Sequence, residues 1–396
     1  MATDNNNKVL NVPNLRFSGF GGEWEREKLR DKCSFYSGGT PSSSNKSYYN
    51  GEIPFIRSGE ISGDSTELFL SEFGLNNSSA KMVDIGDLLL ALYGATSGQI
   101  AISKIRGAIN QAILCIKSSY DNIFLKSVWE KHVDKILQAY LQGGQGNLSA
   151  DIVKNLSFYF PSLDEQNKIS KLIVLIDERI ETQNKIIEDL KKLKVAICNK
   201  LIDNLVNREP LVRFTEVYSK AGEGGTPETS KSEYYENGNI PFIKIDDLSN
   251  KYIISNKDFI TDLGLQKSSA WIIPTHSLIY SNGATIGAIS INTYEVCTKQ
   301  GILGIVPKTS ISVEYLYCLM LSNYFSKRVH RIITHGTMAT AYLKDINKIK
   351  VPIPCMQKQL EIANTFSSAT NKIETELNIL SLLLKQKQYL LQQMFI

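Results

Sequence analysis

Residues 37–56 read SGGTPSSSNKSYYNGEIPFI, and residues 223–243 read EGGTPETSKSEYYENGNIPFI. Both stretches contain Gly-Gly-Thr-Pro, a polar run, Tyr-Tyr and Ile-Pro-Phe-Ile, in that order. Further matches follow at an offset of 186 to 190 residues: GL at 74–75 and 264–265, SSA at 78–80 and 268–270, GAT at 94–96 and 283–285, and Q at 111 and 300. Because the period is long and occurs only twice, the chain contains a duplicated domain and not a solenoid of short repeats.

Each copy of the repeat is predicted to be an α+β domain. Its short apolar runs lie between Gly, Pro, Asn and Ser residues, which is typical of strands separated by turns. The predicted strands are IPFI at 53–56, LLLALY at 88–93, AILCI at 112–116, IPFI at 240–243, SLIYS at 277–281 and GILGI at 301–305. One helix is predicted after the last of these strands in each copy, near residues 122–140 and 313–331.

A long helix is predicted after each copy, because residues 164–205 and 357–395 contain no Gly or Pro and are rich in helix formers. Both segments carry a seam with alternating steps of four and three residues, which is the heptad pattern of a coiled coil. The first seam is Ile169, Ile173, Ile176, Ile180, Gln183, Ile187, Leu190, Lys194, Ile197 and Leu201. The second seam is Ile362, Phe366, Ala369, Ile373, Glu376, Leu380, Leu383, Lys387, Leu390 and Met394.

The two seams predict an antiparallel two-helix coiled coil in which Lys194 faces Glu376 and Lys387 faces Gln183. In this register, the other predicted pairs are apolar: Ile187 with Leu383, Leu190 with Leu380, Ile197 with Ile373, and Ile180 with Leu390. Polar residues in a seam lower stability but fix the register, and this arrangement accounts for all four of them. The alternative is that each helix packs on its own globular domain.

The predicted architecture is therefore α+β, with two similar domains separated by the coiled-coil spacer and related by a pseudo-twofold axis. The predicted boundaries are 1–160 for the first domain, 161–206 for the first spacer helix, 207–353 for the second domain and 354–396 for the second spacer helix. The seam from residue 169 to residue 201 spans roughly 50 Å at about 1.5 Å per residue. Half-sites on duplex DNA recur about every 34 Å, so two similar domains at a fixed separation suit a split DNA site.

The composition favours a soluble globular protein, because 42% of the 396 residues are hydrophobic and 21% are charged. The formal net charge of +4 permits an anionic partner but does not require one. No apolar run is long enough to span a bilayer, and no signal core is found near residue 1, so we expect a cytoplasmic protein without membrane contact. Six scattered cysteines fit a reducing compartment.

Sequence motifs for catalysis are missing from the chain. It contains no Gly-Lys, which excludes a phosphate-binding P-loop, and no adjacent prolines, which excludes the Asn-Pro-Pro-Tyr type of motif in amino-methyltransferases. The cysteines form no C-x-x-C pair and the four histidines lack metal-ligand spacing, so no metal site is predicted. No catalytic residue is predicted, although a set that assembles only in three dimensions stays open.

Over its whole length, the chain resembles the specificity subunit of type I restriction–modification systems. The segment NLRFSGFGGEWEREKL at 14–29 resembles the family's opening, and the paired GGTP and IPFI segments resemble the starts of its two target recognition domains. The helices IDERIETQNKIIEDLKKLKVAI and LLLKQKQYLLQQMFI resemble its two conserved spacer regions. The resemblance implies a non-catalytic subunit for host defence that reads a split, asymmetric sequence of double-stranded DNA. It also implies binding to two methyltransferase (modification) subunits and, through them, to motor–nuclease (restriction) subunits. No cofactor is expected in this chain, because S-adenosylmethionine and ATP are expected only in those partner subunits.

The residues predicted to contact DNA lie at or beside the shared turns, where the two copies often differ. Arg57 in the first copy aligns with Lys244 in the second, and Asn110 aligns with Lys299. Side chains such as Arg, Asn and Gln read base edges in the major groove, so such changes predict two different half-sites. The candidates are Gly39, Thr40, Lys46, Arg57, Tyr93, Thr96, Gln99, Asn110 and Gln111 in the first copy, and Thr226, Lys231, Lys244, Asp246, Asn282, Thr285, Lys299, Gln300, Arg331 and His335 in the second.

Structural interpretations of the same features are open beside the DNA-binding ones. The Gly-Gly turns can serve backbone geometry alone, and the Tyr-Tyr pairs can pack on the domain core. Residues 321–350 hold six basic residues against one acidic residue, which suits phosphate contact or an ordinary solvated face. For the whole chain, the alternatives to a DNA specificity subunit are a coiled-coil scaffold that presents two protein-binding modules, and an enzyme with an unrecognised site.

Overall fold

The computed structural model describes residues 10–141, 147–283, 285–334 and 339–396. The chain divides into two compact units: unit 1 is Met1–Asn184 with Asn378–Ile396, and unit 2 is Lys185–Leu377. Each unit therefore contains one copy of the repeat together with parts of both long helices. In the described part of the chain, no helix combines the length and the apolar character required for a membrane span.

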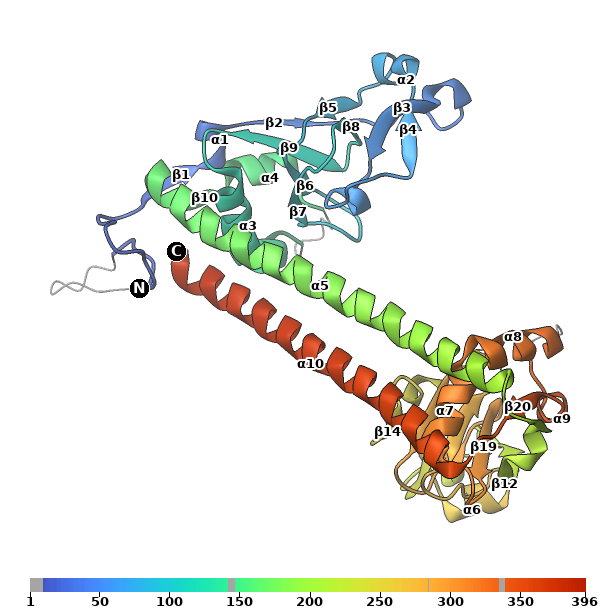
Figure 1. Cartoon of the computed structure of the whole chain (residues 1–396). Helices are drawn as coiled ribbons and strands as arrows, with labels where there is room; N and C mark the ends of the chain where they lie inside the picture. The colour runs from blue at the N-terminus through green and yellow to red at the C-terminus, as the bar shows by residue number, and fades with distance from the viewer. Residues whose placement is uncertain (1–9, 142–146, 284, 335–338) are drawn as a thin grey trace. The chain divides into compact units, whose positions relative to one another are not determined.

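Unit 1 contains three small sheets, with the strand orders β2-β9-β6-β7, β4-β3-β8-β5 and β1-β10 (Figure 1). Only the β3–β8 pair in these sheets is parallel. The strands are β1 (Glu25–Lys28), β2 (Cys33–Ser37), β3 (Tyr49–Ile56), β4 (Leu68–Leu70), β5 (Lys81–Val83), β6 (Leu88–Ala91), β7 (Ile100–Ile102), β8 (Gly107–Ile109), β9 (Ile113–Ser118) and β10 (Ser157–Phe160). The shorter helices are α1 (Leu29–Lys32), η1 (Lys46–Tyr48), η2 (Ser58–Glu60), α2 (Glu72–Asn76), α3 (Asn122–Leu141) and α4 (Ala150–Asn155).

Unit 2 repeats this framework, with the strand orders β12-β19-β16-β17-β14, β15-β13-β18 and β11-β20. Its strands are β11 (Leu211–Arg213), β12 (Tyr218–Glu223), β13 (Ile240–Ile243), β14 (Tyr252–Ile253), β15 (Phe259–Ile260), β16 (Leu278–Ser281), β17 (Ile289–Asn292), β18 (Cys297–Thr298), β19 (Ile302–Pro307) and β20 (Lys350–Pro352). Its shorter helices are η3 (Phe214–Glu216), η4 (Ser232–Tyr234), η5 (Ile245–Asp247), α6 (Asp262–Gln266), α7 (Val313–Leu321), α8 (Asn323–Ile332) and α9 (Leu343–Ile346). The predicted strands are thus confirmed in both copies.

The duplication extends to individual hydrogen bonds at the start of the helix that follows the main sheet. In unit 1, the Asp121 amide donates to Gln166 Oε1 at 3.2 Å, and in unit 2 the Ser312 amide donates to Gln359 Oε1 at 2.8 Å. The Asp121 carboxylate caps α3, whereas the Ser312 hydroxyl caps α7. These two caps align α3 with α7 residue by residue.

The single helix predicted near residues 313–331 is wrong, because two helices occupy this segment. Ser322 lies between α7 and α8 with extended backbone angles, φ −66° and ψ 151°. Its hydroxyl accepts a hydrogen bond from the Phe325 amide and so forms the N-cap of α8. The counterpart in the first copy, α3, is continuous and matches its predicted bounds.

The two predicted long helices are confirmed as α5 (Leu163–Val206) and α10 (Met356–Met394). All twenty seam positions are buried or partly buried, which confirms the predicted seam on each helix. In unit 1, the beginning of α5 and the end of α10 share a core, which includes Ile169, Ile173, Leu391 and Met394. In unit 2, the end of α5 and the beginning of α10 share a core, which includes Cys198, Ile202, Ile362 and Phe366. The helices are therefore antiparallel neighbours within each unit, and they also pack on the domains.

The predicted charge pairing along the seam needs correction. Lys194 lies over the ring of Phe366 at 4.4 Å from its centroid. Phe366 and Glu376 are ten residues apart, about 15 Å of helix, so Lys194 does not pair with Glu376. Lys387 forms ion pairs with Asp177 and Glu130, at 2.8 and 3.1 Å, two acidic residues outside the predicted seam. The long lysine side chains reach partners outside the expected register, which a seam pattern alone does not reveal.

Candidate nucleic-acid interface

The Gly-Gly-Thr-Pro turn has the same structural role in both copies, because it brings the chain tightly against the strand β8 or β18. A Cβ atom on Gly38 would lie 1.8 Å from the Ile109 carbonyl oxygen, and one on Gly224 would lie 2.0 Å from that of Thr298. Gly39 is likewise buried, and its amide donates to Ile109 at 3.2 Å. The glycines therefore act through close backbone packing, and the next residue of each turn is the first that presents a side chain.

The structure brings this turn together with the predicted glutamine in both copies. In unit 1, the hydroxyl of the exposed Thr40 donates to Gln111 Oε1. Gln111 also forms a hydrogen bond with Tyr93, whose pKa is raised by burial. In unit 2, Thr226 Oγ1 accepts a hydrogen bond from the Gln300 amide at 3.2 Å. A threonine and a glutamine that are far apart in sequence thus meet in each domain, through their side chains in unit 1 and through the Gln300 backbone amide in unit 2.

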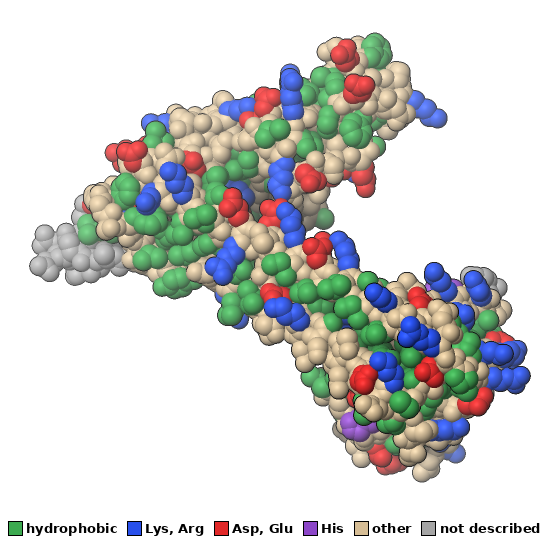
Figure 2. All heavy atoms as spheres, in the orientation of Figure 1, with side chains coloured by type: hydrophobic (Ala, Val, Ile, Leu, Met, Phe, Trp, Pro, Cys, Tyr) green, Lys and Arg blue, Asp and Glu red, His purple; other side chains and the backbone are tan. Residues whose placement is uncertain are grey.

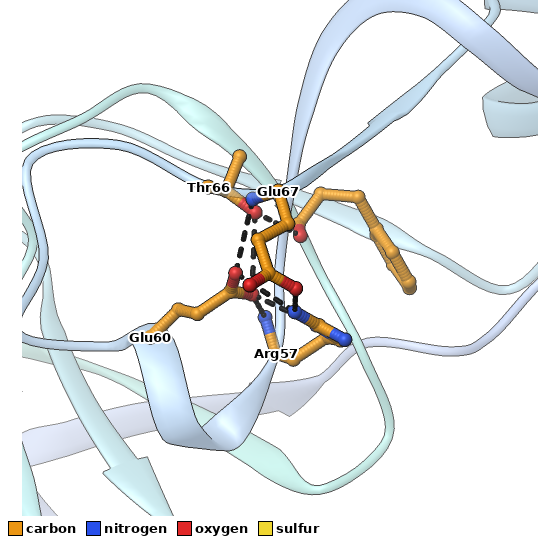
Figure 3. Close-up of polar contacts among 5 residues, drawn as sticks. Arg57, Glu60, Thr66 and Glu67 are labelled. Atoms are coloured by element: carbon orange, nitrogen blue, oxygen red, sulfur yellow. Dashed lines mark hydrogen bonds and ion pairs between the residues drawn. The ribbon is translucent and has the colours of Figure 1, made fainter. Parts of the chain in front are cut away.

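In unit 1, Arg57 belongs to a compact polar cluster with Glu60, Thr66 and Glu67 (Figure 3). Its Nε and Nη2 donate to the Glu60 carboxylate at 3.0 Å each, and Nη2 also donates to Glu67 at 2.5 Å. These hydrogen bonds raise the pKa of Arg57. Among the described residues, its Nη1 has no hydrogen-bond partner, so one edge of the guanidinium is held in place and still available.

Glu60 is the centre of this cluster. Partial burial tends to raise its pKa, but hydrogen bonds from the Arg57 side chain and from the Glu67 and Arg57 amides outweigh that effect and lower the pKa to about 2. Thr66 Oγ1 also lies 3.2 Å from the Glu60 carboxylate. The carboxylate is thus ionised at neutral pH and keeps Arg57 in a single position.

In unit 2, five predicted residues line one cavity of ≈ 480 Å³. They are Thr226, Lys244, Asp246, Lys299 and Gln300. Lys244 takes the place of Arg57, with its Nζ 2.6 Å from the Asp258 carboxylate and its amide 2.8 Å from that of Asp247. The cavity walls thus carry both signs of charge beside amide and hydroxyl groups, a combination that suits hydrogen bonding to base edges.

The remaining candidates lie apart from these two clusters. Lys46, Gln99 and Thr285 are exposed, Thr96 is partly exposed, and Gln99 lines a separate cavity beside Trp129. Lys231 is an exposed partner of Glu228. Asn110 caps its own turn, because its Oδ1 accepts from the Ala112 amide at 3.2 Å.

The last two predicted DNA-contacting residues are Asn282 and His335. Asn282 is completely buried, and its side-chain amide donates to the Ala341 carbonyl at 3.3 Å, so its role in this structure is to tie two loops together. His335 lies outside the described residues.

Basic side chains gather on the part of unit 2 that carries α8 and α9 (Figure 2). The group consists of Lys327, Arg328, Arg331, Lys344, Lys348 and Lys350, all of which are exposed or partly exposed. Arg328 stacks on Tyr324 and Lys348 pairs with Asp345, while Lys327, Arg331 and Lys350 have no ion-pair partner among the described residues. This surface can attract an anionic polymer without sequence preference.

The sequence interpretation missed the acidic residues that position the two central cations. Glu60 and Asp247 each lie three residues after the cation and accept a hydrogen bond from its amide, which is a capping-box arrangement. This three-residue spacing is visible in the sequence and could have identified both acidic residues. Glu67 and Asp258 directly precede β4 and β15, the strands that pair antiparallel with β3 and β13, and only the folded chain places them near Arg57 and Lys244.

Comparison with known proteins agrees with this duplicated architecture. The "Type I restriction modification DNA specificity domain" family matches residues 21–192 and again residues 211–384. The MjaIX specificity subunit of Methanocaldococcus jannaschii, a type I restriction enzyme subunit, is 23% identical over 371 residues, with 85% of each chain covered. The EcoR124I/EcoR124II specificity subunit of Escherichia coli is 30% identical over 173 residues, covering 42% of this chain and 43% of that one.

Two solved structures share the fold. The S subunit of a type I restriction–modification system from M. genitalium has a TM-score of 0.56 at 17% identity, with 97% of this chain and 99% of that chain covered. A chain from a study of type I system assembly and conformational transition has a TM-score of 0.60 at 16% identity, with 94% and 97% covered. With both halves matched, the chain belongs to the type I restriction modification DNA specificity family and is a specificity subunit of such a system.

Proposed function

We propose that this specificity subunit reads an asymmetric, bipartite site on double-stranded DNA, with one recognition domain on each half-site. The observation that carries the proposal is the paired polar cluster: each domain presents a threonine, a glutamine and a positioned cation on the same framework. The cation is Arg57 in unit 1 and Lys244 in unit 2, and Asn110 is replaced by Lys299. Equivalent positions with different side chains favour different base sequences in the two half-sites.

The basic surface of unit 2 supplies affinity in this proposal, and the polar clusters supply specificity. Exposed lysines and arginines attract the phosphate backbone, and such contacts carry no sequence information. The isolated subunit then binds DNA weakly, with an affinity that falls steeply with salt.

The chain acts without catalysing a reaction, and its partners carry the chemistry. Two methyltransferase subunits bind it and hold S-adenosylmethionine, and motor–nuclease subunits that hold ATP join through them. Exposed apolar side chains on both long helices support a docking role, because exposed apolar surface on a soluble protein marks a site of protein–protein interaction. They include Leu175, Leu193, Val195, Leu377, Leu382, Leu384 and Tyr389. The complex acts in the cytoplasm, in defence against foreign DNA.

A domain exchange tests the reading role. Replacing residues 35–160 with the corresponding segment of another family member should change one half-site and leave the other intact, as determined by sequencing methylated DNA from cells that carry the whole system. Changes in both half-sites would contradict independent domains. An unchanged site would instead support a scaffold that does not read DNA.

A second experiment tests the division of labour between subunits. The purified chain should incorporate no labelled methyl groups into DNA, whereas the chain together with its cognate methyltransferase should do so. Methylation by the isolated chain, free of other subunits, would overturn the non-catalytic assignment.

A further inference from the structure

A second cavity in unit 2, of ≈ 690 Å³, lies away from the Thr226–Gln300 cluster. Its walls come from α5, α7, α10 and the loops around β14 and β17. They include two lysines, Lys194 and Lys251, and two tyrosines, Tyr252 and Tyr317. The one acidic residue in this lining is Glu374, which is exposed.

Neither lysine has a carboxylate partner among the described residues. Lys194 is partly buried against the Phe366 ring, and Lys251 Nζ donates to Ser367 Oγ at 3.0 Å. Burial lowers the pKa of Lys194, and the charge of Lys251 acts in the same direction, while the charge of Glu374 acts in the opposite direction without reversing the shift. Two ammonium groups are thus held near each other in a partly desolvated place, where a compensating anion is worth more than in open water.

The equivalent position in unit 1 shows which negative charges the unit 2 cavity lacks. Lys387 occupies the same seam position as Lys194, and it is neutralised by Asp177 and Glu130 at 2.8 and 3.1 Å. Lys194 and Lys387 share a seam position, and the same offset aligns Asp177 on α5 with Thr370 on α10. The caps of α3 and α7 align Glu130 on α3 with Leu321 on α7.

Neither replacement supplies a negative charge to the cavity in unit 2. The Thr370 hydroxyl is already committed to its own helix, at 3.0 Å from the Phe366 carbonyl oxygen. Leu321 is apolar. The duplication has therefore kept the partly buried cation, while uncharged side chains replace both of its counter-charges.

We propose that this cavity binds the phosphate group of a small anion, which supplies the negative charge that Asp177 and Glu130 supply in unit 1. Two lysines acting as point charges suit a phosphate dianion, which needs no bidentate geometry. The exposed Glu374 weakens binding but is screened by solvent. Tyr252 and Tyr317 form walls that accommodate an organic group on a phosphate monoester.

Calorimetric titration of the full chain at constant ionic strength tests the site, with inorganic phosphate, AMP and adenosine as probes. Phosphate or AMP should bind and adenosine should not, and the ratio of the two affinities shows whether the free ion or the monoester is preferred. Lys194→Met and Lys251→Met should each weaken binding at least tenfold. Lys192→Met is the matched control on α5, because its side chain is 76% exposed and its loss of charge should change nothing.

One variant restores the unit 1 arrangement. Thr370→Asp places a carboxylate beside Lys194, as Asp177 is placed beside Lys387, and should abolish anion binding while the chain stays folded by circular dichroism. Glu374→Gln should strengthen binding. No binding of either phosphate or AMP at millimolar concentration would overturn the proposal, and so would equal losses in Lys194→Met and Lys192→Met.

Discussion

Arg57 with Glu60 and Glu67 in unit 1 corresponds to Lys244 with Asp247 and Asp258 in unit 2. In both units, the acidic residue three positions after the cation accepts the cation's own amide proton, so the turn is shaped identically. The cation itself differs, because Arg57 offers a planar guanidinium held by two carboxylates, whereas Lys244 offers a single ammonium group. The duplicated framework is thus retained while the chemical group that it presents has changed.

The two seam lysines differ in a complementary way. Lys387 has Asp177 and Glu130 as ion-pair partners, whereas Lys194 lies over an aromatic ring and forms no ion pair with a carboxylate among the described residues. Here the cation is retained and its surroundings have changed. The duplication therefore preserves backbone geometry most strictly and charge compensation least strictly.

The largest expected effect tests the shared framework. Gly38→Val and Gly224→Val should each destabilise their own unit by about 4 kcal/mol or more, because a Cβ atom would lie 1.8 and 2.0 Å from a backbone oxygen. Urea denaturation with hydrogen exchange resolved by unit measures both. Gly59→Ala is the control, because no atom lies within 4 Å of its added Cβ. Losses below about 1 kcal/mol in either copy would disprove a common steric requirement.

Next in size is the contrast between the seam lysines. Lys387→Met should destabilise the chain by about 2 kcal/mol, since it leaves Asp177 and Glu130 with only Lys126 as a cationic partner among the described residues, and the Lys387 side chain is only 17% exposed. Lys194→Met should change stability by no more than about 1 kcal/mol, because it removes a cation that has no carboxylate to leave unpaired. Urea denaturation in phosphate-free buffer measures the stability of both variants, and equal losses of stability would contradict the proposed difference between the two lysines.

A third pair of variants sharpens the comparison of the two cations. Arg57→Ala should relax specificity in one half-site and Lys244→Ala in the other, each by about 1–3 kcal/mol of discrimination against the wrong base. Sequencing methylated DNA from cells with each variant system gives the result. If either variant alters both half-sites, the two clusters do not act independently.

The smallest effect depends on pH and on Glu60. Because its folded pKa is about 2, compared with an ordinary value of 4.5, Glu60 contributes stability that is present above pH 4.5 and is lost as the pH falls toward 2. Glu60→Gln should therefore lower the free energy of unfolding by about 1–2 kcal/mol at pH 7, and the difference from the wild type should shrink on acidification. The exposed Glu52→Gln is the control. A constant difference from pH 7 to pH 2.5 would argue against this role of the carboxylate.

The fold was predictable where it depends on local pattern and on the duplication. The strands, the long helices and both seams follow from periodicity and from the absence of Gly and Pro. The break at Ser322 was missed because a serine within an apolar helical run gives no strong stop signal, and its capping role appears only once Phe325 folds over it. The seam register was assigned by matching opposite charges, but Lys194 instead reaches an aromatic ring and Lys387 reaches acidic residues outside the seam.

The candidate site was predictable in part for a similar reason. Thr40, Gln111, Thr226 and Gln300 stood out because they flank repeated turns, and the structure brings each pair together. Glu67 and Asp258 gave no signal, since their approach to Arg57 and Lys244 requires a neighbouring hairpin strand to fold alongside. The buried position of Asn282 was missed because a polar residue in a glycine-rich loop reads as exposed.

The division of α10 between the two units has a consequence for the order in which the chain matures on the ribosome. Unit 2 is a continuous stretch of sequence, so all its parts are available once residue 377 has emerged. Unit 1 begins first, yet Trp24 and Phe124 share a core with Phe395, and the Leu15 amide donates to the Gln393 carbonyl oxygen at 2.9 Å. The core of unit 1 therefore stays incomplete until the whole second unit has been synthesised. The earlier half of the chain therefore cannot complete its core before the later half has been synthesised, which departs from the usual order in which the N-terminal domain folds first.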